Sequence, residues 1–239
     1  MIALLALILA VVISLLWYLP GIRAQGENRV LRRKDYFRVA LVYGFAFTCL
    51  LIIFTEIVWD SLVDKTALSG LPKEFVADFF RAALLEEFFK FRGFKLAKNK
   101  LGLRRKIDYM MIAGLIGLVY GIVEKAVHGS IGGVVIGLAI PMHIVWQFNQ
   151  GGHYHEYEAL KAAGDPASAR KAWMMAVPAT FLFHGCWDSG LDIAFFCLDR
   201  EALAVQLTGG ALLLAMIAFG IVYSVKTVRK VQRTARAEA

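Results

Sequence analysis

The chain has 239 residues, 59% of them hydrophobic, and a mean hydropathy of +0.59. Soluble domains are about 45–50% apolar, so this composition excludes an ordinary soluble protein and indicates a membrane protein. In a soluble protein the net charge of +8 would suggest that the protein binds nucleic acid. In a membrane protein the placement of the charges matters more than their sum.

Seven segments meet the length of about 20 mostly apolar residues that a membrane-spanning helix needs. They lie near residues 2–19, 39–59, 75–96, 108–128, 130–150, 174–198 and 203–224. We therefore predict an all-α, polytopic membrane helical bundle with about seven transmembrane helices in a single integral membrane domain. Segment 2–19 lacks the features of a cleaved signal peptide and is expected to be a peripheral anchor helix. We expect residues 74–198 to form the core of the bundle, and helix 203–224 to be followed by a basic cytoplasmic tail, 225–239.

The basic residues between these segments predict the orientation. The connections after the first, third and fifth segments, together with the tail and the adjoining segment ends, hold 21 Lys and Arg residues, whereas the alternate connections and their adjoining ends hold four. The positive-inside rule then places the N-terminus outside and the C-terminus in the cytoplasm. We expect a multi-pass protein of the cell inner (plasma) membrane, with the lipid bilayer as a partner and no nucleic acid. The longest cytoplasmic connection, 151–173, is expected to be a loop in which His153 and His155 are solvated.

Within the third segment, the charged residues Glu86, Glu87 and Lys90 are expected at hydrocarbon depth. Each charge buried there costs about 2.5–3.5 kcal/mol on insertion scales. One Glu and one Lys would suffice for a structural ion pair, which leaves the second carboxylate without compensation. Two carboxylates in a low-dielectric site do not both ionise easily, and that is the arrangement general acid–base catalysis needs. The functional interpretation is favoured over a packing ion pair.

The fourth and fifth segments each add polar residues one turn apart. Tyr120, Glu124 and His128 form a stripe on the fourth segment, although Glu124 would also fit as a marker of the outer membrane boundary. His143 follows Pro141 on the fifth, where a proline frees a backbone carbonyl, and Gln147 lies one turn further on. Small residues at four-residue spacing allow close packing between these two segments, and they are Gly117, Gly121, Gly129, Gly133 and Gly137.

The sixth segment carries His184, Asp188 and Asp192 at four-residue spacing. A histidine with a carboxylate one turn away has an orienting partner, as a base or a metal ligand requires. We expect Glu86, Glu87, Glu124, His143 and His184 to line one buried cavity.

These residues resemble the motifs of the PrsW family of intramembrane proteases, related to the clan of CAAX prenyl endopeptidases and bacteriocin-processing enzymes. Glu86, Glu87 and Lys90 match its Glu-Glu-x-x-Lys motif. Tyr120 and Glu124 match an aromatic residue followed four positions later by Glu, with Tyr in place of Phe and Lys125 in place of Asn. His143 resembles the lone His of the next helix, and His184 with Asp188 resembles the last motif. The likeness covers about residues 74–196.

The resemblance implies a peptidase that cleaves membrane-anchored proteins at or near the cytoplasmic side of the bilayer. In the glutamate-type mechanism, Glu86 or Glu87 takes a proton from water, and His143 or Glu124 orients that water. His184 and Asp188 stabilise the oxyanion, while Lys90 holds the second carboxylate ionised. A single-pass protein such as an anti-sigma factor is the implied substrate. The rival mechanism is a zinc metalloprotease in which the same site binds the metal through Glu87, Glu124, His143 and His184.

Three points stay open at the level of sequence. The functional alternative is a proton-coupled transporter or channel that uses the same buried Glu and His residues as a relay, and a non-catalytic scaffold is a third interpretation. The identity of the general base, Glu86 or Glu87, is not decided by spacing. Counted along ideal helices, Glu124 lies deeper than Glu87 by about 8–12 Å, so its membership of the site depends on how the helices are arranged.

Overall fold

A computed structural model describes residues 33–55, 57, 70–127 and 133–238. All regular structure in this part of the chain is helical, which confirms the predicted all-α class. The elements are α2 (Arg33–Phe54), α4 (Leu71–Val76), η2 (Ala77–Leu85), α5 (Glu86–Leu101), α6 (Lys106–Val127), α7 (Gly133–Ala162), α8 (Pro166–Ala176), α9 (Pro178–Leu198) and α10 (Leu203–Ala237). The predicted anchor helix 2–19 lies outside the described residues.

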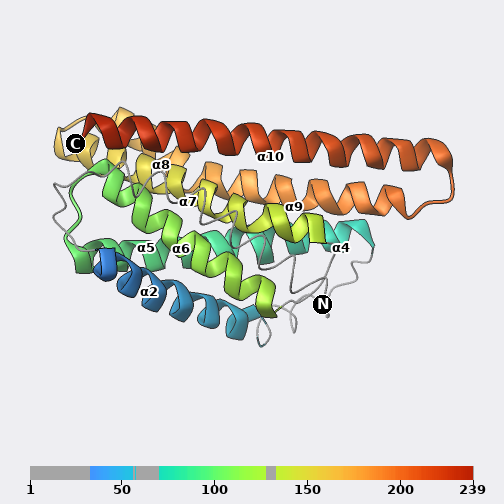
Figure 1. The fold of residues 1–239 in the computed structure, drawn as a ribbon, viewed down its shortest axis with the longest axis horizontal. Coiled ribbons are helices and arrows are strands. Elements are labelled where there is room, and N and C mark those ends of the chain that lie inside the picture. Colours follow the sequence, from blue (N-terminus) through green and yellow to red (C-terminus); the bar gives the residue numbers. More distant parts are fainter. Residues whose placement is uncertain (1–32, 56, 58–69, 128–132, 239) are drawn as a thin grey trace.

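The long helices run roughly along one direction, with α2 on one side of the bundle and the α9–α10 pair on the other (Figure 1). The centre is α6, because 78% of its most apolar window, within Lys106–Glu124, is buried, against 22% for α2 and 11% for α10. Close packing against α7 is possible because α6 carries glycines where the two backbones meet. A Cβ added at Gly117 would lie 2.5 Å from the backbone oxygen of His143. The predicted role of Gly117 and Gly121 is therefore confirmed, while Gly129 lies outside the described residues.

Three described helices, Lys34–Phe54, Lys106–Glu124 and Leu203–Ala237, are long and apolar enough to cross a membrane. The surface agrees with this, because large apolar side chains on the outer helices point away from the bundle. Leu41 on α2 and Leu214 on α10 are more than half exposed, at 58% and 68%. Charged side chains such as Glu87 and Lys90 are instead buried at the centre. A large apolar exterior, together with charged side chains buried inside the bundle, fits a protein that is surrounded by lipid.

The third predicted segment is continuous helix, but its backbone changes type along its length. After α4 the chain forms the π-helical stretch η2, and it returns to α-helix at Glu86, the first residue of α5. The π-helical form is rare, and where it occurs it is often found at functional sites. Here it ends directly before the two glutamates.

The expectation of a long loop at 151–173 is wrong. Helix α7 continues to Ala162, and after a short turn the chain forms α8. Gly151 and Gly152 do not end α7, because Gly151 packs so closely on α6 that an added Cβ would lie 2.5 Å from the backbone oxygen of Tyr109. His153 contacts Glu156, and His155 contacts the backbone oxygen of Arg104, so neither imidazole is simply solvated.

The tail predicted after residue 224 is also helical, since α10 continues to Ala237. Val231 and Ala235 are buried in the main core at 2% and 1% exposure. The carboxylate of Glu238 accepts hydrogen bonds from the backbone N–H groups of Lys106 and Ile107 and so caps the start of α6. The last residues of the chain thus fasten α10 to the central helix.

Candidate active site

The site begins on α5, where Glu86 and Glu87 both face the interior. The flanking side chains point outward, with Leu84 at 41% and Phe88 at 53% exposure, whereas Glu86 and Glu87 are 7% and 1% exposed. Two adjacent residues lie about 100° apart on an α-helix, so both can face a wide interior. The buried face continues along α5 through Lys90.

Lys90 is completely buried and joins three of the predicted site residues. Its ammonium donates to Glu86 Oε2 at 3.0 Å and to Glu87 Oε1 at 2.9 Å. Its third contact, also 2.9 Å, is with Nδ1 of His143 on α7. An ammonium has three N–H bonds and accepts none, so these three contacts use its full donor capacity.

His143 connects the glutamate pair to α6. Because Lys90 can only donate, Nδ1 of His143 must accept, which places the imidazole proton on Nε2. That nitrogen lies 2.9 Å from Glu124 Oε2. The close approach of α6 permits this contact, since a Cβ at Gly121 would lie 2.9 Å from Cδ2 of His143. Glu124 is therefore part of the site and is not merely a marker of the membrane boundary.

His184 joins from α9 and lies between two carboxylates. Its Nδ1 is 3.0 Å from Glu87 Oε1, and its Nε2 is 3.0 Å from Asp188 Oδ2. Both ring nitrogens donate to an acceptor-only group when Glu87 and Asp188 are ionised, which is the pattern of an imidazolium. The ring also stacks on Trp146 with 4.4 Å between centroids, so its orientation is fixed from two directions.

Gln147 belongs to this group, although the sequence did not identify it as a site residue. Its Nε2 donates to Glu87 Oε2 at 2.7 Å, and the side chain is completely buried. Both oxygens of Glu87 are thus engaged, one by Lys90 and His184 and the other by Gln147. The available signal was its position one turn after His143 on the same helix face.

The structure brings together all the residues that the sequence singled out as site residues and that it describes. They come from four elements and are Glu86, Glu87, Lys90, Tyr120, Glu124, His143, His184 and Asp188. His128 lies outside the described residues. Asp188 is the most open of the acidic groups, with 29% of its side chain exposed.

Among the contacts described above, this cluster holds more acidic than basic groups. Four carboxylates, those of Glu86, Glu87, Glu124 and Asp188, lie with two cationic groups, Lys90 and a doubly donating His184. Negative charge is expensive in a low-dielectric interior, so burial favours the protonated form of a carboxyl group. A buried carboxylate that exchanges a proton can both accept and return one during a reaction.

A metal ion could be held by Glu86, His143 and His184. Each offers one ligand atom, these atoms lie within 4.8 Å of one another, and all three residues are buried. This set differs from the predicted one, because Glu87 is engaged by Lys90 and Gln147, and Glu124 lies behind His143. Lys90 Nζ contacts two of the three residues, Glu86 and His143, so its ammonium competes with a metal for the same groups.

Comparisons with protein-family models, with curated protein sequences and with solved structures gave no match to this chain. A function for this chain therefore has to follow from the chemistry of the buried cluster.

Proposed function

We propose that the chain is an intramembrane peptidase that hydrolyses membrane-anchored proteins by a glutamate-type mechanism. The observation that carries this proposal is the buried network of Glu86, Glu87, Lys90, His143 and His184 inside a bundle whose exterior is apolar. A structural role needs no surplus carboxylate, whereas activation of water needs a base that is held in position and can be protonated. The resemblance of these residues to the PrsW motifs agrees with the same reaction.

Glu86 is the better candidate for the general base. Glu87 is engaged through both oxygens, by Lys90, His184 and Gln147, and acts as an anchor. The close contact of Glu86 uses Oε2, which leaves Oε1 for a water molecule. Glu86 then takes a proton from that water as its oxygen attacks the substrate carbonyl carbon. The same proton passes to the leaving amine as the C–N bond breaks, and Glu86 returns to its starting state.

The remaining groups act on charge and orientation. His184, held between Glu87 and Asp188, places a positive charge where the oxyanion of the tetrahedral intermediate forms. Lys90 fixes the tautomer of His143, and Glu124 lies against the other nitrogen of that ring. A zinc mechanism remains the alternative, because Glu86, His143 and His184 lie close enough to share one ion and zinc favours such N and O ligands.

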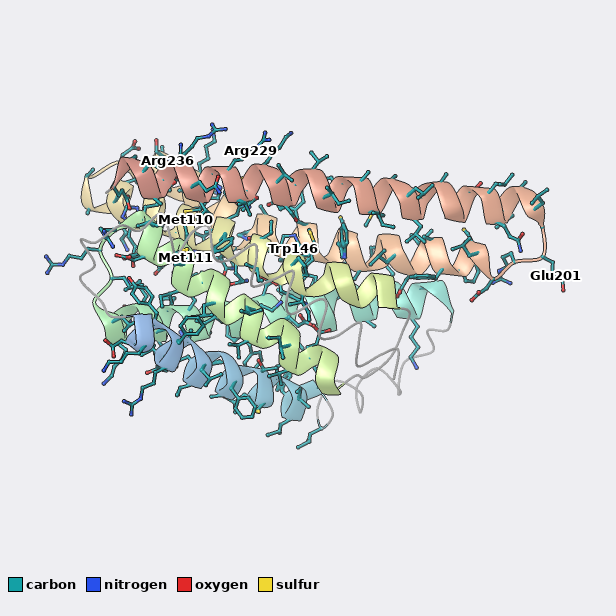
Figure 2. All side chains as sticks on the ribbon, in the orientation of Figure 1. Met110, Met111, Trp146, Glu201, Arg229 and Arg236 are labelled. Carbon is teal, nitrogen blue, oxygen red and sulfur yellow. The ribbon has the colours of Figure 1, made fainter. Side chains whose placement is uncertain are left out.

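We further propose seven spans with the N-terminus outside and the C-terminus in the cytoplasm of an inner (plasma) membrane. The basic residues support this arrangement, since Arg229 and Arg236 lie toward one end of the bundle and Glu201 lies at the opposite end (Figure 2). The starts of α2 and α6 and the ends of α5 and α10 gather at the end of the bundle where Arg236 lies (Figure 1). A single-pass protein such as an anti-sigma factor, cleaved near the cytoplasmic side, is the substrate that the resemblance favours.

The test is cleavage of fluorogenic and single-pass substrates by purified protein in liposomes. The double variant Glu86→Gln/Glu87→Gln should lose all turnover while its helical content is retained. Glu201→Gln is the matched control, since Glu201 is exposed on the α9–α10 connection, and it should cleave at the wild-type rate. Cleavage by the double variant would refute the proposal.

Removal of metal separates the two mechanisms in the same preparation. After treatment with a chelator and elemental analysis, a glutamate-type enzyme keeps its rate. A rate that falls with metal loss and returns with added zinc favours the zinc alternative. Proton flux across the vesicles without hydrolysis of any substrate would favour the transporter instead.

A further inference from the structure

Tyr120 has a buried hydroxyl group that takes no part in the contacts of the site described above. The residue is completely buried on α6. Its ring lies beneath the ammonium of Lys90, with 4.3 Å between Nζ and the ring centroid, and its centroid is 5.9 Å from that of His143. Within the described part of the chain the hydroxyl has no hydrogen-bond partner, although three carboxylates of the site are near enough to act on it electrostatically.

An unpartnered buried hydroxyl requires an explanation, because burial removes its hydrogen bonds to water. Phenylalanine would supply the same ring beneath Lys90 without that loss. A comparison within the chain is Tyr36 on α2, which is buried at 7% exposure and donates to Asp108 Oδ1 at 2.7 Å. Tyr36 thus has the partner that a structural tyrosine normally has, whereas Tyr120 has none among the described residues.

The site also needs a donor that its cationic groups do not supply. Lys90 directs its three N–H bonds at Glu86, Glu87 and His143. Both nitrogens of His184 face carboxylates. A tetrahedral oxyanion that forms among carboxylates is repelled by them, so a neutral donor close to the site would stabilise it without breaking any of these contacts.

We propose that the Tyr120 hydroxyl donates a hydrogen bond to the substrate carbonyl oxygen and holds it more strongly as the oxyanion develops. This inference rests on the proposed peptidase function. The phenol keeps its proton throughout, and the proton taken from water still passes through Glu86 to the leaving amine. Tyr120 is then a catalytic residue, and Lys90 positions its ring.

The experiment compares Tyr120→Phe with wild type and with Tyr36→Phe in one liposome preparation. Both variants remove a single oxygen from a buried ring. For Tyr120→Phe we expect kcat to fall about 100-fold or more, as on removal of an oxyanion donor, with KM within about twofold. Its melting temperature should equal or exceed that of wild type, because no hydrogen bond is lost. For Tyr36→Phe we expect the reverse, a lower melting temperature with kcat retained.

Two outcomes would overturn the inference. Unchanged kcat in Tyr120→Phe would show that the hydroxyl plays no part in the reaction. A fall in kcat accompanied by a loss of thermal stability like that of Tyr36→Phe, or by failure to fold, would assign the hydroxyl a structural role. Failure of the proposed function itself is a separate result, since in that case the wild-type protein would not cleave any substrate.

Discussion

Lys90 provides the sharpest test of how the site is held together. Its ammonium is completely buried and contacts Glu86, Glu87 and His143 at 3.0, 2.9 and 2.9 Å. Lys90→Met keeps an unbranched side chain but removes the charge and leaves two buried carboxylates without their cation. Breaking a buried ion pair from one side costs about 3–5 kcal/mol. That is a large part of a typical stability of about 5–15 kcal/mol.

For a chain of this size, 1 kcal/mol corresponds to about 2–4 °C in melting temperature, so we expect a fall of about 6–20 °C. The measurement is thermal unfolding in mild detergent followed by tryptophan fluorescence. Lys100→Met is the matched control, because Lys100 is exposed in the last turn of the same helix, and its effect should stay within about 0.5 kcal/mol.

A double-mutant cycle identifies the source of the loss. If the uncompensated carboxylates destabilise Lys90→Met, then adding Glu86→Gln should recover part of the stability instead of lowering it further. The reasoning is refuted if Lys90→Met unfolds within about 1 kcal/mol of wild type, or if the two changes simply add. Either result would mean that the ammonium does not neutralise the glutamate pair.

Two further predictions concern the scaffold around the site. Gly117→Ala should lower stability by about 1–3 kcal/mol and reduce turnover, because its Cβ would meet the backbone oxygen of His143 at 2.5 Å. The control is Gly210→Ala on α10, which has open space around it and should leave stability unchanged or raise it. The pKa of Glu156 is lowered from 4.5 to about 2, first by its hydrogen bond with His153 and then, against the opposing effect of burial, by Lys106. The contribution of Glu156 to folding is therefore complete above about pH 4.5 and is lost as the pH falls toward 2. Urea unfolding of wild type and Glu156→Gln at a series of pH values should show a difference in unfolding free energy that shrinks as the pH falls from about 4.5 toward 2. A difference that does not change with pH would contradict this.

Much of the site could be predicted because a membrane penalises buried polar residues. Glu86, Glu87, His143 and His184 were identifiable one by one, since each stands in an apolar segment where an aliphatic residue would be less costly. Their contacts could not be predicted from spacing. That His143 lies between Lys90 and Glu124 depends on the close approach of α6 and α7. Gln147 was noted one turn after His143 but not assigned to the site, because a neutral amide carries a weaker signal than a charge.

The predicted difference in membrane depth between Glu124 and Glu87 depended on where the two helices were assumed to end. Glu87 lies 14 residues before the end of α5 at Leu101, which is about 21 Å along the axis, and Glu124 lies 18 residues after the start of α6 at Lys106, about 27 Å. The helix of Glu87 is thus longer than the apolar pattern indicated, since its last turns are rich in lysine. His143 contacts both Lys90 and Glu124 and so bridges the remaining distance.

The extent of helix beyond the apolar segments was underestimated for a related reason. Gly151 and Gly152 and the charges that follow them have the composition of a loop, yet α7 continues to Ala162. Tertiary packing overrides the weak helix propensity of glycine when the missing side chain lets two helices touch, as Gly151 does against Tyr109. Cross-helix contacts such as those of Lys98 and Tyr109 with Glu158 then satisfy charges that the sequence assigned to solvent.

The position of Lys90 relates the two possible mechanisms to each other. Its ammonium contacts Glu86 and His143, two of the three residues that could hold a metal. A protonated lysine at this distance repels a divalent cation and already neutralises part of the acidic cluster, so a metal would have to displace it at the cost of a buried charge. The same ammonium contacts both glutamates, but Glu87 is also held by His184 and Gln147, whereas Glu86 is not held by Gln147. Lys90 therefore disfavours the zinc alternative, and the further contacts of Glu87 give the adjacent glutamates unequal roles, which is what a water-activating pair requires.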